Sequence, residues 1–140
     1  LSEDAILAAM KSGLGYITES PTGPHLEIRA GDTPMGGTVP SLPAIEAHVR
    51  GAKGDRLVLI DATGPIADIE IASDDWTETI AVSPKTFLRA EIIAAASREN
   101  LIAQFTAMLD GRELPWQLKN ADLAEQPIRR ALSNPIYIRS

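Results

Sequence analysis

Short segments of alternating hydrophobicity dominate the chain between residues 15 and 93. Apolar residues occupy every second position in these segments, and Gly, Pro, Asp or Ser residues separate one segment from the next. One segment reads HLEIRA, which places Leu26 and Ile28 on one face and Glu27 on the other. Because successive side chains of a β-strand point to opposite faces, this period predicts strands with one buried face.

About seven segments of this kind follow one another, at spacings typical of an immunoglobulin-like β-sandwich. They read GYIT, HLEIRA, AIEAHVR, RLVLID, IADIEIA, WTETIAV and FLRAEII. Since no helix-length segment separates them, a parallel doubly wound sheet is disfavoured. The length of 140 residues suits one domain. We therefore expect residues 1–140 to form a single, mainly β domain with added helices, an immunoglobulin-like antiparallel β-sandwich of about seven to eight strands.

Helical periodicity marks residues 1–14. Ser2 can cap the first turn, Glu3 and Asp4 suit the positive end of the helix dipole, and Gly13 can end the helix. The apolar residues of this segment share one face; they are Ile6, Leu7, Met10 and Leu14. This pattern predicts a short connecting helix whose apolar side needs a partner.

The C-terminal part is expected to hold a helical insertion at residues 97–132. Ser97 can cap a helix with an apolar stripe that ends at Gly111. An irregular connection follows, and the segment PIRRALS is expected to be a short helix that begins at Pro127.

The last strand is expected at residues 134–139. Pro135 lacks an amide donor and biases Asn134 toward an extended backbone, which suits the beginning of an edge strand. Ile136 then faces one side and Tyr137 the other. These four residues are expected to form a structural closing motif, in which Tyr137 packs or bonds locally and takes no part in catalysis.

Composition excludes several function classes. The net charge is −6 and the 13 Lys and Arg residues are scattered, so neither nucleic acid nor an anionic membrane is an expected partner. The absence of Cys excludes disulfides, thiolate metal sites and cysteine nucleophiles. No apolar run approaches the length of a membrane span, so a soluble domain is expected, in the cytoplasm or the periplasm.

Candidate catalytic groups are few. The two histidines, His25 and His48, form no HxH or HExxH pair, and we interpret both as solvent-facing strand residues. The adjacent acids Asp74 and Asp75 point to opposite faces of a strand and fit a turn better. The glycine-rich residues 30–41 match no phosphate-binding pattern and are expected to connect two strands. We therefore expect no catalytic residue and no metal ligand in this chain.

Exposed aromatic rings would support a different function, an independent carbohydrate- or protein-binding module. Trp76, Trp116 and Tyr137 could form its platform. Burial is the usual state of large rings in a chain with only 4% aromatic residues.

Three segments resemble the C-terminal part of bacterial PHP-type metallohydrolases, the polymerase and histidinol phosphatase superfamily, in its carbaryl-hydrolase-like branch. They read AILAAMKSGLGYITESPTGPHLEIRAG, LRAEII and PIRRALSNPIYI. In that family a helix followed by G-x-x-Y/F-I-(T/S) leaves the catalytic barrel, and (T/S)-N-P-I-Y-(V/I) closes the chain. Residues 14–18 and 133–138 carry the resemblance.

The resemblance implies a non-catalytic accessory domain of a metal-dependent phosphoesterase or related hydrolase. Such a domain would pack on an upstream catalytic barrel of the same polypeptide, shape access to its site, or mediate homo-oligomer formation. The family's metal site uses histidine and acidic ligands, including an H-x-H motif, on the barrel. None of those positions lies in these residues, so a divalent metal is expected only in the catalytic domain.

Overall fold

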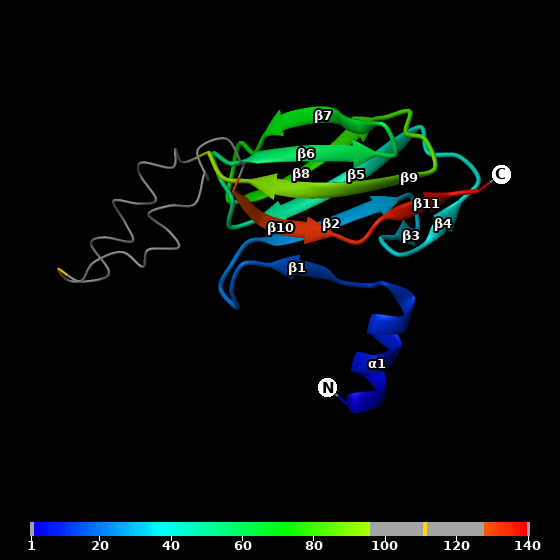
Figure 1. The fold of residues 1–140 in the computed structure, drawn as a ribbon, viewed down its shortest axis with the longest axis horizontal. Helices are drawn as coiled ribbons and strands as arrows, with labels where there is room; N and C mark the ends of the chain where they lie inside the picture. The colour runs from blue at the N-terminus through cyan, green and yellow to red at the C-terminus, as the bar shows by residue number, and fades with distance from the viewer. Residues whose placement is uncertain (1, 96–110, 112–127, 140) are drawn as a thin grey trace.

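The computed structural model describes residues 2–95, 111 and 128–139. This part of the chain forms one helix and eleven strands, arranged in two sheets (Figure 1). Buried side chains from both sheets form one hydrophobic core. The β-sandwich predicted from the alternating segments is therefore confirmed.

The larger sheet has β9 at its centre. Its seven strands are β1 (Tyr16–Thr18), β4 (Thr38–Val39), β6 (Arg56–Asp61), β7 (Gly64–Glu70), β9 (Phe87–Ile93), β10 (Arg129–Ser133) and β11 (Ile136–Ile138). β9 pairs antiparallel with β6, β10 and β11, and β7 lies beyond β6. β1 pairs antiparallel with β10, whereas β4 runs parallel to β11. β10 therefore lies between the N-terminal strand β1 and the central strand β9, and β11 lies between β9 and β4.

The smaller sheet has the order β3-β2-β5-β8, with every neighbouring pair antiparallel. Its strands are β3 (Thr33–Pro34), β2 (His25–Ala30), β5 (Ala44–Arg50) and β8 (Asp75–Ala81). Burial alternates along β2 and β5, as the sequence pattern predicts. One face of this sheet packs into the core, and the other carries polar side chains.

The core consists mainly of aliphatic side chains. The largest fully buried ones are Leu26, Ile28, Ile45, Val49, Leu57, Leu59, Ile71, Leu88, Ile92 and Ile136. Full burial of such a side chain stabilises the fold by about 1.5–3 kcal/mol. The sandwich therefore has an apolar interior with few aromatic rings.

The N-terminal helix α1 (Glu3–Ser12) projects from the sandwich (Figure 1). Its N-cap is Ser2, whose Oγ accepts a hydrogen bond from the amide of Ala5 at 3.2 Å. Gly13, with φ of 71°, ends the helix in the left-handed conformation. The predicted N-terminal helix is thus confirmed. Within the described residues, no helix combines the length and the apolar character needed to cross a membrane.

The short helix predicted at the segment PIRRALS is wrong for residues 129–133, which form β10. Ala131 and Ser133 are buried at alternate positions, and the strand pairs with both β1 and β9. These long-range pairings override the local helix signal of Pro127. The rest of the predicted insertion, apart from residues 111 and 128, lies outside the described residues.

Candidate functional site

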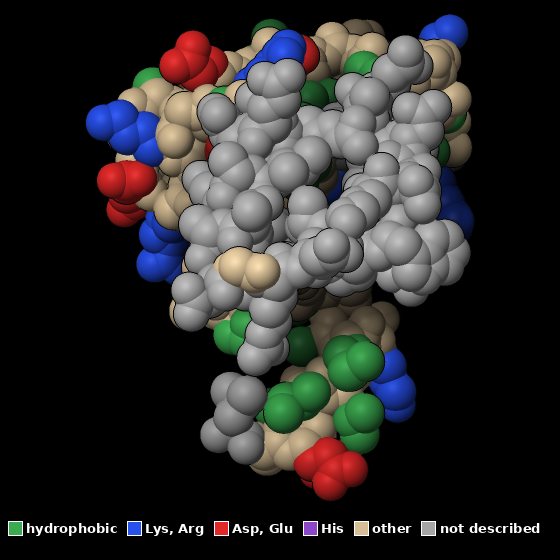
Figure 2. Space-filling view, turned by 60° about the vertical axis from the view of Figure 1, so that its left-hand side comes forward, with side chains coloured by type: hydrophobic (Ala, Val, Ile, Leu, Met, Phe, Trp, Pro, Cys, Tyr) green, Lys and Arg blue, Asp and Glu red, His purple; other side chains and the backbone are tan. Residues whose placement is uncertain are grey.

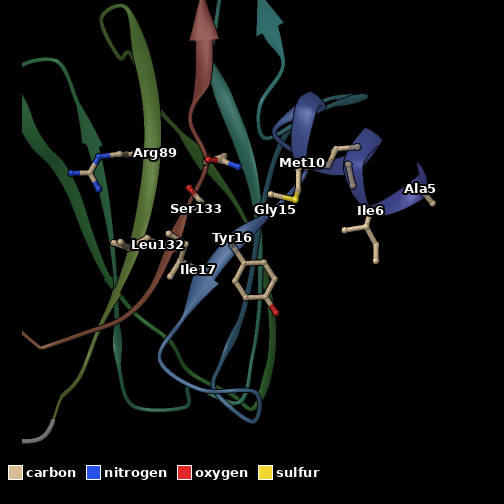
Figure 3. A pocket seen from close by; sticks show the side chains of 12 residues that line it. Ala5, Ile6, Met10, Gly15, Tyr16, Ile17, Arg89, Leu132 and Ser133 are labelled. Carbon is tan, nitrogen blue, oxygen red and sulfur yellow. The ribbon is translucent and has the colours of Figure 1, made fainter. Parts of the chain in front are cut away.

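An apolar hollow of about 730 Å³ lies between α1 and the edge of the larger sheet (Figure 3). We call it the α1 groove. Its lining residues are Ala5, Ile6, Ala9, Met10 and Leu14 from α1 and its exit, Gly15, Tyr16 and Ile17 from the segment of β1, and Arg89, Leu132, Ser133 and Asn134. Figure 3 shows Met10 extending from α1 toward the strands, where Ile17 and Leu132 lie together.

The apolar side chains around the α1 groove are unusually exposed. Met10 is 73% exposed and Ile17 is 69% exposed, and Ile6, Leu7 and Leu14 are each nearly half exposed. α1 itself contains no buried residue. Figure 2 shows hydrophobic side chains gathered at the bottom of the view, where α1 lies. A contiguous apolar surface of this kind is typical of an interaction site.

The closing motif holds the base of α1. The side-chain Nδ2 of Asn134 donates a hydrogen bond to the carbonyl oxygen of Gly13 at 2.8 Å. The carbonyl oxygen of Pro135 accepts one from the amide of Gly36, also at 2.8 Å. β1 and β10 then pair in the register Tyr16 to Ser133. Residues 14–18 and 133–138, which lie at opposite ends of the sequence, are thus neighbours at the base of α1.

Two glycines permit this close approach. Gly13 and Gly36 both have positive φ, at 71° and 88°. A Cβ on Gly36 would lie 2.4 Å from the carbonyl oxygen of Ser12, a contact that backbone atoms cannot relieve without moving α1. The backbone therefore crosses itself in close contact at Gly13 and Gly36, and this crossing helps to fix the direction in which α1 leaves the sandwich.

The other two residues of the closing motif, Ile136 and Tyr137, face different surroundings. Ile136 is fully buried and pairs with Leu88 of β9. The amide of Tyr137 donates to the carbonyl oxygen of Gly37 at 2.9 Å, whereas the residue as a whole is 39% exposed. Tyr137 lines a small hollow together with Met10 of α1. The motif thus contributes one core side chain, and Tyr137 lies beside the helix.

A second candidate site lies on the outer face of the smaller sheet. Leu26 and Val49 point into the core, so His25 and Glu27 of β2 and His48 of β5 lie on the opposite face. Glu27 is directly opposite His48 in the register, and the two imidazole rings are 5.7 Å apart. One potential ligand atom from each of the three residues lies within 4.8 Å of the other two. This His-Glu-His cluster is half-buried.

Each histidine in the cluster has a partner outside it. Nδ1 of His25 and the hydroxyl of Tyr16 are hydrogen-bonded at 3.1 Å, and the Nε2 of His25 is 3.8 Å from Oε2 of Glu27. Nε2 of His48 is hydrogen-bonded to Oδ1 of Asp75 at 2.7 Å. Both rings are therefore oriented by groups on neighbouring strands, β1 and β8.

The surroundings of His25 favour its neutral form. Burial is the largest effect and lowers the pKa of His25 below its usual 6.5. The nearby charges of Arg50 and His48 lower the pKa further, whereas Glu27 raises it. Near pH 7 the imidazole is therefore mostly unprotonated, as a metal ligand or a hydrogen-bond acceptor must be.

Sequence reasoning did not bring these residues together. His25 and His48 do lie on strands and on the outer face, as interpreted, but their proximity depends on the pairing of β2 with β5. Asp75, expected in a turn, begins β8 and bonds to His48. The one available signal was that His25 and Glu27 share a face of one alternating segment, while His48 lies on the outer face of the next.

The other residues singled out in the sequence lie apart from the His-Glu-His cluster. Trp76 is buried and cannot form a binding platform, and Trp116 lies outside the described residues. The glycine-rich residues 30–41 include the short strands β3 and β4 and contribute Gly36 to the base of α1.

Together these features define a β-sandwich with a projecting amphipathic helix and a polar cluster on one outer face. No protein-family model, no curated protein and no solved structure matches the chain.

Proposed function

We propose that this chain is a non-catalytic accessory domain of a PHP-type, metal-dependent phosphoesterase or related hydrolase. It packs through the α1 groove against the catalytic domain that precedes it in the same polypeptide. The observation that carries the proposal is the exposed apolar face of α1, a helix with no buried residue.

A helix as short as α1 gains stability from a partner. A helix of 10 residues is marginal in water by itself, because nucleation is costly and few hydrogen bonds follow it. The exposed side chains of Ile6, Met10 and Ile17 add apolar surface that water disfavours. Burying one such side chain against a partner contributes about 1.5–3 kcal/mol. A docked partner therefore stabilises both the helix and the complex.

The geometry favours a partner joined to the N-terminal end of α1. The helix projects from the sandwich, and its far end is the N-terminal one (Figure 1). A domain that precedes α1 would be tethered beside the α1 groove, at an effective concentration of about millimolar. The fixed crossing at Gly13 and Gly36 would hold that domain in one orientation.

The resemblance noted in the sequence supports the same partner. Residues 14–18 and 133–138, which carry it, meet at the base of α1 and set the direction of the helix. In this proposal the family-like segments form the joint between the two domains. The domain then supports the catalytic barrel or shapes access to its site.

A carbohydrate- or protein-binding module is the weaker alternative. Of the rings proposed for its platform, Trp76 is buried and Tyr137 is exposed only in part. A homo-oligomer formed through the same apolar face is a further alternative. Sedimentation velocity of the 140-residue chain tests it, because a dimer formed through this face would dissociate when Met10 is replaced by Glu.

The first test is the coding sequence upstream of Leu1. The proposal expects it to encode a barrel that bears an H-x-H motif in the same reading frame. A frame without such a barrel would refute the assignment to a PHP-type hydrolase.

The second test measures docking directly. The preceding domain and this chain, expressed separately, should bind one another in isothermal titration calorimetry. Met10→Glu should weaken that binding by about tenfold or more, because a charge replaces an apolar side chain at the centre of the contact. Ala8→Glu is the matched control, because Ala8 lies on the side of α1 away from the groove. Equal binding by the two variants would contradict docking through the α1 groove.

A further inference from the structure

We propose that His25, Glu27 and His48 bind one divalent transition-metal ion, of which Zn²⁺ is the natural probe, on the outer face of the smaller sheet. None of these three residues lines the α1 groove, although Tyr16, which does, is hydrogen-bonded to His25; the proposal does not depend on the proposed docking. It replaces the expectation from sequence that the chain holds no metal ligand.

The spacing of the ligand atoms suits a metal ion. One atom from each residue lies within 4.8 Å of the other two, and Nε2 of His25 is 3.8 Å from Oε2 of Glu27. Metal–ligand bonds of 2.0–2.2 Å in a tetrahedral site separate the ligand atoms by about 3.4 Å. Side-chain rotations that bring these atoms closer would therefore close the site.

The hydrogen bonds around the cluster match those that orient metal-binding histidines. A ligating imidazole commonly donates its other N–H to a carboxylate or another oxygen, which fixes the tautomer. Oδ1 of Asp75 accepts a hydrogen bond from Nε2–H of His48, so that Nδ1 of His48 keeps its lone pair for a metal ion. When Nδ1–H of His25 donates to the hydroxyl of Tyr16, Nε2 of His25 is free to bind.

Glu27 is placed to supply the third ligand. Its Oε1 accepts a hydrogen bond from Nη1 of Arg29 at 3.4 Å, while Oε2 faces His25. The guanidinium of Arg29 thus orients the carboxylate, although its charge, like that of Arg50, opposes a cation. The negative charges of Glu27 and Asp75 offset these two cations.

The donor set selects the type of metal. Two imidazole nitrogens and one carboxylate suit Zn²⁺ and its neighbours in the first transition row, whereas Mg²⁺ and Ca²⁺ prefer oxygen ligands alone. The side chains of His25, Glu27 and His48 are 28%, 32% and 33% exposed, so solvent can reach the ion. The positions left open by the protein would hold water.

A purely structural interpretation makes the opposite prediction. Edge-to-face packing of the two imidazole rings and their bonds to Tyr16 and Asp75 could stabilise the sheet without any ion. An arrangement with this purely structural role would bind no metal ion stoichiometrically.

Calorimetric titration of the untagged 140-residue chain with Zn²⁺ distinguishes a metal site from a purely structural cluster. The proposal expects one equivalent of Zn²⁺, a dissociation constant in the micromolar range or below, and no binding of Mg²⁺ under the same conditions. His48→Gln and Glu27→Gln should each weaken Zn²⁺ binding by about tenfold or more. Glu46→Gln is the control, because Glu46 lines a small hollow together with Glu27 and His48 but is not in the cluster.

The visible absorption of bound Co²⁺ gives a second measurement, since its intensity reports the coordination number. It should change on His25→Gln and stay unchanged on Glu46→Gln, with circular dichroism verifying that each variant is folded. Absence of stoichiometric Zn²⁺ binding, or equal binding by His48→Gln and the unmodified chain, would overturn the proposal.

Discussion

Replacement of Gly36 by Ala tests how α1 is held to the sandwich. The added Cβ would lie 2.4 Å from the carbonyl oxygen of Ser12 and 2.7 Å from two backbone atoms of Gly13. Gly54 is the matched control. Its φ is 87° against 88° for Gly36, and a Cβ there would have nothing within 4 Å. The two variants share the backbone strain and differ in the collision.

The magnitudes follow from these two effects. A left-handed conformation costs an L-residue about 1–2 kcal/mol, so Gly54→Ala should lower the free energy of unfolding by that amount. Overpacking adds about 1–3 kcal/mol, so Gly36→Ala should lose about 2–5 kcal/mol in total. A domain of this size is typically stable by about 5–15 kcal/mol, so the loss in Gly36→Ala is a large and measurable part of the total.

Urea denaturation followed by the fluorescence of tryptophan, including the buried Trp76, measures the loss of stability. Limited trypsin cleavage after Lys11, in the last turn of α1, reports whether the helix has moved. We expect faster cleavage in Gly36→Ala than in Gly54→Ala. Equal stability and equal cleavage of the two variants would refute the close crossing at Gly36.

Two further predictions concern the sandwich itself. Ile136→Ala should destabilise the domain by about 2–5 kcal/mol, because it leaves a cavity at a fully buried position. Ile138→Ala, at a half-buried position, should cost less. Urea denaturation compares the two variants, and equal losses of stability would contradict a closing strand packed in the core. Asp61 accepts hydrogen bonds from the hydroxyl of Thr63, from the amide of Lys85 and from the amide of Thr63. These bonds, of which the one from the Thr63 hydroxyl has the largest effect, hold the pKa of Asp61 below the usual 3.8. Its carboxylate therefore adds stability that is fully present above pH 3.8 and is lost as the pH falls through the lower folded pKa. Asp61→Asn should have a lower free energy of unfolding than the unmodified chain near neutral pH, and the difference between the two should shrink below pH 3.8. If this difference did not depend on pH, the ionised carboxylate of Asp61 would not be the source of the stability.

The strands and the helix could be predicted because their signals are local. The alternation around Leu26 and Ile28 marks β2, and Ser2 and Gly13 mark the two ends of α1. The alternation reports which face of a segment is buried, and the capping residues report where the helix begins and ends. Both signals lie in the order of neighbouring residues.

Segment 129–133 was misassigned because its structure depends on distant partners. Pro127 offers a local helix signal, but Ala131 pairs with Ile92 of β9 and with Thr18 of β1. A single sequence does not reveal such pairings, and burial of alternate side chains on the sheet outweighs helix propensity.

The His-Glu-His cluster was missed for the same physical reason. His25 and His48 are 23 positions apart, and only the register that sets Glu27 opposite His48 makes the three residues neighbours. A shift of one residue would turn His48 into the core. In contrast, the apolar face of α1 was visible in the sequence, although its projection from the sandwich was not.

Hydrogen–deuterium exchange of α1 in the longer polypeptide tests docking to the preceding domain most directly. Amides of α1 should exchange about tenfold or more slowly there than in the 140-residue chain, because the docked domain suppresses opening of the helix. Met10→Glu should abolish this protection, and Ala8→Glu should preserve it. Equal exchange of α1 with and without the preceding domain would show that α1 does not dock.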